Sequence, residues 1–175
     1  MIAELEERFP EMAEALGPRN LEILFRATTP LELPAGRKVI RDRMPVDSLY
    51  LILDGEVSIS VEEGGKSIHL GEVGPGQWLG EVSVLSGEFL ASSTVTTATP
   101  VRMLRLRHQA FEDLIATNYE IASVLLRHFV ALLADRLRTS VRSFGAVQDG
   151  TEDGQRTATP VAESRGWIRS IFSSR

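Results

Sequence analysis

Between residues 28 and 107 the sequence consists of short segments of alternating apolar and polar residues, separated at close intervals by turn signals. The turn signals are Pro34-Ala35-Gly36, Asp54-Gly55, Gly64-Gly65 and Gly74-Pro75-Gly76. The segment 92–107 is β-branched and alternating, with a break at Thr99-Pro100. Short strands separated by turns at such close intervals predict an antiparallel sandwich or barrel.

Helices are expected on both sides of this β region. Over residues 3–26, apolar residues such as Leu5, Phe9 and Met12 recur at roughly helical spacing, and Gly17-Pro18 interrupts the pattern. Two short helices joined by a turn fit this segment. A further helical region begins at His108.

A long helix is expected from Tyr119 to about Arg142, with apolar residues on two sides. The first stripe is Ile121, Leu125, Phe129 and Leu132, and the second is Leu126, Val130, Leu133 and Leu137. A helix that is apolar on two sides needs two partners. One partner is the barrel, and the second is predicted to be the same helix of another subunit, packed as a short coiled coil in a homodimer. Burial of both stripes within one subunit remains an alternative.

After Phe144 large apolar residues almost disappear, which predicts a flexible linker. The terminal segment "GWIRSIFSSR" then places Trp167, Ile168, Ile171 and Phe172 on one face of a helix. This tip is predicted to dock on a protein partner. A membrane interface, touched only peripherally, and the protein's own surface are the alternatives.

The sequence therefore divides into five regions. They are N-terminal helices at 1–27, a barrel at 28–107, C-terminal helices at 108–143, a linker at 144–164 and an amphipathic docking tip at 165–175.

The composition of the chain excludes several classes of function. The chain has no cysteine, which excludes thiolate catalysis and cysteine-based metal sites. Its three histidines, His69, His108 and His128, have neither metal-ligand nor triad spacing, so neither an enzyme nor a metal site is expected. A net charge of −5 gives no electrostatic case for nucleic acid. The acidic amphipathic N-terminus does not resemble a secretory signal, and a cytoplasmic location is expected.

Two stretches carry a resemblance to a known family. They are "LPAGRKVIRDRMPVDSLYLILDGEVSIS" and "VGPGQWLGEVSVL", in this order. Over roughly residues 15–142 the sequence resembles the cyclic nucleotide-binding domain of catabolite-activator regulators, kinase regulatory subunits and gated channels. The resemblance implies a mainly β fold with flanking helices: an eight-stranded jelly-roll barrel followed by a long C-terminal helix, which often pairs across a dimer.

The resemblance also implies a ligand cassette at "GEVSVLSGEFLASSTV", residues 80–95. The ligand-binding residues, if binding is retained, are Gly80, Glu81, Val82, Ser83, Ser92 and Ser93. In relatives that bind cAMP or cGMP, an arginine nine or ten residues after the glutamate pairs with the phosphate. That position falls here on Leu90 or Ala91.

No local cation replaces the arginine in the surrounding sequence. From Met44 to Pro100 there are eight acidic residues and one lysine, Lys66, which gives a net charge of −7. Loss of a charge-assisted partner weakens phosphate binding by roughly 1.5–3 kcal/mol. Arginines of the long helix, such as Arg127 or Arg138, are an alternative source of charge.

The resulting interpretation is a non-enzymatic regulatory or accessory subunit with weakened or lost nucleotide binding, which acts through protein–protein interaction. The alternative is a genuine cAMP or cGMP sensor with a variant cassette that signals through the long helix. No cofactor is predicted with certainty. DNA binding is not expected, because the segment after the long helix has no room for a helix-turn-helix.

Overall fold

The computed structural model of the chain describes residues 1–87 and 90–148, and for residues 86, 136–137 and 139–148 it describes the backbone alone. The predicted linker beyond residue 148 and the docking tip lie outside these residues. Trp167, Ile168, Ile171 and Phe172 therefore stay sequence predictions.

The N-terminal segment forms two helices, α1 (Ile2–Arg8) and α2 (Pro10–Ala27). Gly17 interrupts α2 with a φ of 69°, so the expected break at Gly17-Pro18 is confirmed. A second break, which the sequence analysis did not anticipate, lies at Phe9, just before Pro10 begins α2. Proline is favoured in a first helical turn because its missing N–H has no helical partner there.

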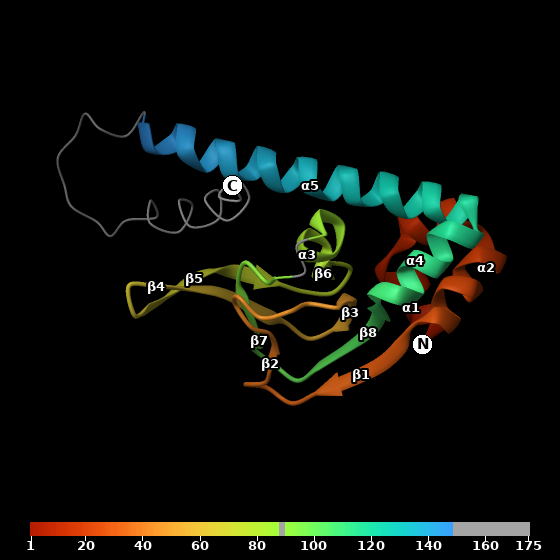
Figure 1. Cartoon of the computed structure of the whole chain (residues 1–175), viewed down its shortest axis with the longest axis horizontal. Coiled ribbons are helices and arrows are strands. Elements are labelled where there is room, and N and C mark those ends of the chain that lie inside the picture. Colours follow the sequence, from red (N-terminus) through yellow and green to blue (C-terminus); the bar gives the residue numbers. More distant parts are fainter. Residues whose placement is uncertain (88–89, 149–175) are drawn as a thin grey trace.

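The β region contains eight strands within the described residues. They are β1 (Thr29–Leu33), β2 (Lys38–Ile40), β3 (Ser48–Asp54), β4 (Val57–Glu63), β5 (Lys66–Val73), β6 (Trp78–Leu79), β7 (Thr94–Thr97) and β8 (Val101–Arg107). They form two antiparallel sheets with the orders β1-β8-β3-β6 and β2-β7-β4-β5 (Figure 1). This arrangement confirms the expected jelly-roll fold.

The predicted turns have two different roles. Gly64-Gly65 closes a hairpin, because β4 and β5 on either side pair with each other. The turn at Asp54-Gly55 instead carries the chain from β3 in one sheet to β4 in the other. The turn at Pro34-Ala35-Gly36 makes the same kind of crossing between β1 and β2. These crossings wrap the two sheets around a common core.

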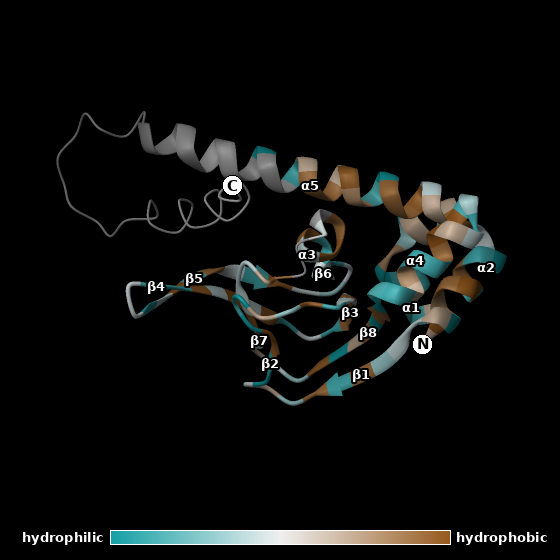
Figure 2. Ribbon diagram, viewed as in Figure 1, coloured by the Kyte–Doolittle hydropathy of each residue, from teal (hydrophilic) through white to brown (hydrophobic). Residues whose placement is uncertain are grey.

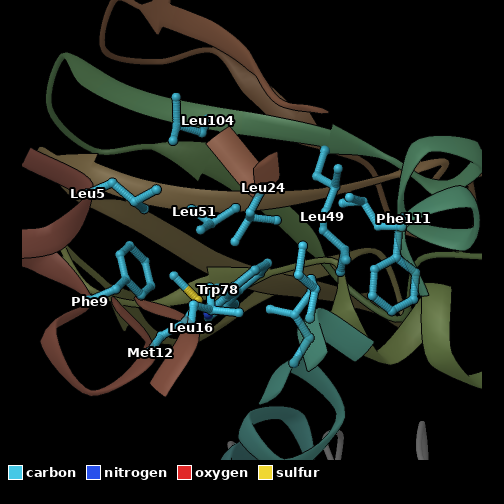
Figure 3. Packing of buried hydrophobic residues seen from close by; sticks show 14 of the residues in the cluster. Leu5, Phe9, Met12, Leu16, Leu24, Leu49, Leu51, Trp78, Leu104 and Phe111 are labelled. Atoms are coloured by element: carbon cyan, nitrogen blue, oxygen red, sulfur yellow. The ribbon is translucent and has the colours of Figure 1, made fainter. Parts of the chain in front are cut away.

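Alternating side chains in β3 and β8 build two cores. Leu51 and Leu104 point toward the helices and join a cluster that contains Phe9 and Trp78 (Figure 3). Ile52 and Met103 belong to a second cluster on the other side of the same strands. Because side chains alternate between the two faces of a strand, these strands are buried on both faces.

Three helices complete the fold: α3 (Glu81–Ser86), α4 (His108–Thr117) and α5 (Tyr119–Gln148). In Figure 1, α5 leaves the group formed by α1, α2 and α4 and extends well beyond it. It ends later than the expected end near Arg142. Within the described residues, no helix is long and apolar enough to cross a membrane.

Candidate functional site

The predicted cassette forms an open hollow at one side of the barrel. The hollow encloses about 460 Å³ with its mouth included. It is lined by Ile40, Ile59, Leu79, Gly80, Glu81, Val82, Ser83, Ala91, Ser92, Ser93 and Val95. All six predicted ligand-binding residues therefore lie around one space, together with apolar side chains from β2, β4, β6 and β7.

Gly80 sets the entry of the chain into this hollow. It caps the N-terminus of α3 in the left-handed region, with a φ of 84°. A Cβ atom at this position would lie 2.5 Å from the carbonyl oxygen of Ser48 in β3. Both the conformation and the close approach require glycine. Gly80 thus has a structural reason to be here whether or not a ligand binds.

The structure separates the two candidate positions for the missing arginine. Ala91 is buried, with 6% of its surface exposed, and lines the hollow. Leu90 is 54% exposed and is not part of the lining. The hydroxyl of Ser83 donates a 3.0 Å hydrogen bond to the Leu90 carbonyl, which ties α3 to this segment. Position 91 is therefore the one from which a side chain enters the hollow.

The lining is neutral or acidic. Among the described residues that surround the hollow, Glu81 is the one charged side chain, and it is 1% exposed. The part of the chain that the structure describes also contains no group of three or more histidine, cysteine or acidic residues that could hold a metal ion. The described lining of the hollow therefore contains no cationic side chain.

The two long-helix arginines whose side chains the structure describes, Arg127 and Arg138, do not supply that cation. The Arg127 side chain bonds back to the carbonyl oxygen and the hydroxyl of Ser123, one turn earlier on the same helix. Arg138 is exposed. Neither residue lines the hollow.

A turn that the sequence analysis did not consider lies directly against the cassette. The Arg43 backbone N–H donates to the Ala91 carbonyl at 2.8 Å, and the Ala91 N–H donates to the Met44 carbonyl at 2.9 Å. An isolated bridge between Pro45 and Leu90 continues this pairing. The count of charges over residues 44–100 left out Arg41 and Arg43. These two arginines precede that range in the sequence, but their turn lies beside the cassette in the fold.

The two predicted stripes of α5 differ in burial. Ile121, Leu125 and Phe129 are buried in the core between the helices and the sheet. On the second stripe, Leu126, Val130 and Leu133 are 45%, 68% and 37% exposed. The structure does not describe the side chain of Leu137. Within the described residues, the second stripe of α5 is therefore an apolar face that the rest of the subunit does not bury, and Figure 2 shows the hydrophobic segments along this helix.

Comparison with known proteins assigns the family. The sequence model of the cyclic nucleotide-binding domain matches residues 30–118, which include the barrel, the cassette and α4. The chain belongs to the cyclic nucleotide-binding domain family. The resemblance inferred from the two sequence stretches is confirmed.

Two curated relatives show how this family is used elsewhere. A cyclic nucleotide-gated potassium channel of Mesorhizobium japonicum is 33% identical over 111 residues, which are 63% of this chain and 29% of the channel. A CRP-like cAMP-activated global transcriptional regulator of Mycobacterium tuberculosis is 32% identical over 126 residues, 71% of this chain and 54% of the regulator. The chain thus spans about half or less of the length of these relatives.

A solved structure supports the fold. A cyclic nucleotide-binding domain from Methylobacillus flagellatus superposes with a TM-score of 0.69 at 22% identity, covering 86% of this chain and 88% of that one. At this identity the likeness concerns the fold alone.

Proposed function

We propose that this chain is a non-enzymatic regulatory domain in which cyclic nucleotide binding is weakened, and which acts through protein–protein contacts. The related channel and transcriptional regulator use domains of this family inside larger regulated proteins. A regulatory role without catalysis is supported by two features of the described residues, a hollow at the predicted cassette and an exposed apolar stripe on α5.

The composition of the hollow carries this proposal. Of the two positions at which the resemblance places a phosphate-binding arginine, Ala91 is the one that lines the hollow, and Glu81 is the one charged residue among the described side chains of the lining. A cyclic phosphate in this hollow lacks a bidentate partner, which costs about 1.5–3 kcal/mol. At about 1.4 kcal/mol per factor of ten, the affinity falls by one to two orders of magnitude.

The exposed stripe of α5 supports a contact with a second copy of the chain. Leu126, Val130 and Leu133 recur at the spacing of a coiled-coil seam, and their exposure leaves apolar surface in contact with water. In a homodimer the same stripe of each subunit would cover the other. A further protein partner bound through the tip, and a cytoplasmic location, stay predictions from the sequence.

A second candidate function is a genuine cyclic nucleotide sensor, and one contact favours it. Trp78, in the strand that leads into the hollow at Leu79 and Gly80, packs edge to face on Phe129 of α5. A ligand that moved this strand would therefore act directly on the long helix. In this alternative, binding shifts the population of α5 positions and so changes its exposed face.

Calorimetric titration of the full chain with cAMP and then cGMP separates the two functions. The regulatory proposal expects dissociation constants in the high micromolar to millimolar range, or no heat. Saturation at low micromolar ligand would overturn the proposal in favour of the sensor.

A further inference from the structure

Arg43 has an unusual backbone conformation for an arginine. Its φ is 59°, and it is the one non-glycine residue with a positive φ among those that the structure describes. A left-handed conformation brings Cβ too close to the backbone and is disfavoured for every residue with a branched or long side chain. Glycine would occupy this position at lower energy. The arginine side chain is therefore kept here at the expense of backbone stability.

The conformation of Arg43 results from two sets of hydrogen bonds. Met44 N–H donates to the Arg41 carbonyl at 3.1 Å, which closes a β-turn with Arg43 at its third position. Arg43 N–H and the Met44 carbonyl both bond to Ala91, so two residues of the turn face one residue of the cassette. This is the arrangement of a β-bulge whose first residue is left-handed and usually glycine. Bulges re-aim side chains and are frequent beside functional sites.

The position of Arg43 relative to the hollow is therefore fixed by its bond to Ala91. Fully hydrogen-bonded neighbours in an antiparallel pair lie about 5.5 Å apart between Cα atoms, and the single bond across the bulge holds Arg43 at a similar range, which an extended arginine side chain exceeds. Ala91 lines the hollow at the position of the missing arginine. An extended arginine side chain on residue 43 is thus long enough to span the distance to residue 91.

The side chain of Arg43 is free to make this movement. It is 85% exposed, and its one ion-pair partner among the described residues is Asp42, with the Nε and Oδ2 atoms 3.9 Å apart. A pair of this length on an exposed side chain contributes little. An anion in the hollow, which would offer a bidentate acceptor, can compete with Asp42 for the guanidinium.

We propose that Arg43 supplies the hollow with its cation from the neighbouring turn, so that the weak anion binding of this domain depends on residue 43 instead of on residue 91. The ligand class is a small molecule with a phosphate or comparable anionic group. The inference rests on the proposed function in one respect, because it attributes to Arg43 the anion affinity that remains in the weakened hollow.

Arg41 provides the matched control. It is an exposed arginine of the same turn, but it lines a separate hollow of about 490 Å³, mouth included, together with Lys38 and Tyr50. Removal of Arg41 changes the net charge near the cassette as much as removal of Arg43 does. If Arg43 acts only through its charge, both variants should lose the same affinity. If Arg43 contacts the anion directly, only the variant at residue 43 should lose affinity.

The test is an NMR titration of the full ¹⁵N-labelled chain with cAMP up to millimolar concentration. Shifts of the amides of residues 80–83 and 91–93 locate the binding in the hollow. We expect saturable shifts in the wild type, a dissociation constant at least about tenfold higher in Arg43→Gly, and little change in Arg41→Ala. Arg43→Lys keeps the positive charge but lacks the planar guanidinium. Its dissociation constant is therefore expected to lie between those of the wild type and Arg43→Gly.

Stability distinguishes loss of a contact from loss of structure. Because glycine relieves the left-handed strain, Arg43→Gly is expected to keep or raise the thermal midpoint while it weakens binding. Equal affinity in wild type and Arg43→Gly, an equal loss in Arg41→Ala, or no binding in the wild type would each overturn the inference and leave the proposed function standing. Low-micromolar wild-type binding that is lost in Arg43→Gly would overturn the weakened-binding proposal and keep the role of Arg43.

Discussion

Trp78 of β6 and Phe129 of α5 pack edge to face, with ring centroids 4.9 Å apart and ring planes inclined by 78°. Both side chains are fully buried. Their contact joins the strand that enters the ligand hollow to the helix that carries the exposed apolar stripe. The hollow and the proposed interaction face are therefore connected through one aromatic pair.

Removal of this contact is expected to destabilise the fold. Phe129→Ala deletes a buried ring and leaves a cavity against Trp78, which costs about 3–5 kcal/mol of the free energy of unfolding. Urea denaturation followed by tryptophan fluorescence measures the change. Tyr119→Ala is the control, because Tyr119 is an aromatic residue of the same helix that is almost fully exposed. A similar loss in both variants would contradict the assignment of Phe129 to the core.

Gly80 and Gly87 allow a steric effect to be separated from a conformational one. Both glycines flank α3 in the left-handed region, with φ values of 84° and 73°. A Cβ atom at Gly87 meets no neighbour within 4 Å, whereas one at Gly80 meets the Ser48 carbonyl. Gly87→Ala is expected to cost about 1–2 kcal/mol, the usual penalty for the conformation. Gly80→Ala is expected to cost clearly more, and equal unfolding midpoints in urea would show that β3 yields to the added methyl group.

The barrel could be predicted from the sequence because its turns carry their own chemical markers. Gly55 and the Gly64-Gly65 pair adopt positive φ angles, which few other residues tolerate. The alternating pattern of β8 also indicated a strand, although not that both of its faces are buried. Burial of both faces depends on the helices that pack against this strand, and the pattern of one segment does not show them.

The role of Arg43 could not be predicted in the same way. Nothing in the residues around position 43 marks it as a neighbour of Ala91, since the two are joined by backbone hydrogen bonds between distant segments. The strain is also invisible in the sequence, because an arginine in a turn is ordinary. The cassette itself was predictable because its residues are contiguous, whereas the charges beside it come from another part of the chain.

Stability is expected to depend on pH through His128. Its ring lies against Trp78 at 5.9 Å between centroids, and burial lowers its pKa, while Glu11 opposes this shift. The unfolded chain therefore takes up a proton on this histidine near pH 6.5 before the folded chain does. This contribution to stability is complete above about pH 6.5 and decreases as the pH falls toward the lower folded-state pKa.

His128→Gln measures this contribution directly. One proton accounts for a slope of at most about 1.4 kcal/mol per pH unit, and for less here because the ring keeps some contact with water. Between pH 7.5 and 5.5, the free energy of unfolding of the wild type should fall more than that of the variant. Parallel curves would show that His128 is not desolvated in solution.

The exposed stripe of α5 predicts an association of two chains. Leu126→Glu places a charge in the proposed seam, and each subunit loses the burial of one leucine, worth about 1.5–3 kcal/mol. The dimer dissociation constant should rise by about a hundredfold or more, as measured by sedimentation equilibrium. Ala131→Glu adds the same charge at an exposed position off the stripe and should leave the dimer intact. A wild-type chain that stays monomeric at high concentration would exclude this use of the stripe.

Restoration of an arginine at position 91 tests whether the hollow still has the geometry of a cyclic nucleotide site. In Ala91→Arg the guanidinium enters the hollow beside Ser92 and Ser93 and faces the bound phosphate, which should lower the dissociation constant for cAMP by about 10–100-fold. Leu90→Arg is the matched control, since residue 90 is exposed and not part of the lining, and its affinity should stay close to that of the wild type. Calorimetry measures both variants, and thermal midpoints near the wild-type value show that the barrel is intact. If Ala91→Arg folds but gains no affinity, the missing arginine is not what weakens the site, because the wall of the hollow then excludes the nucleotide by shape.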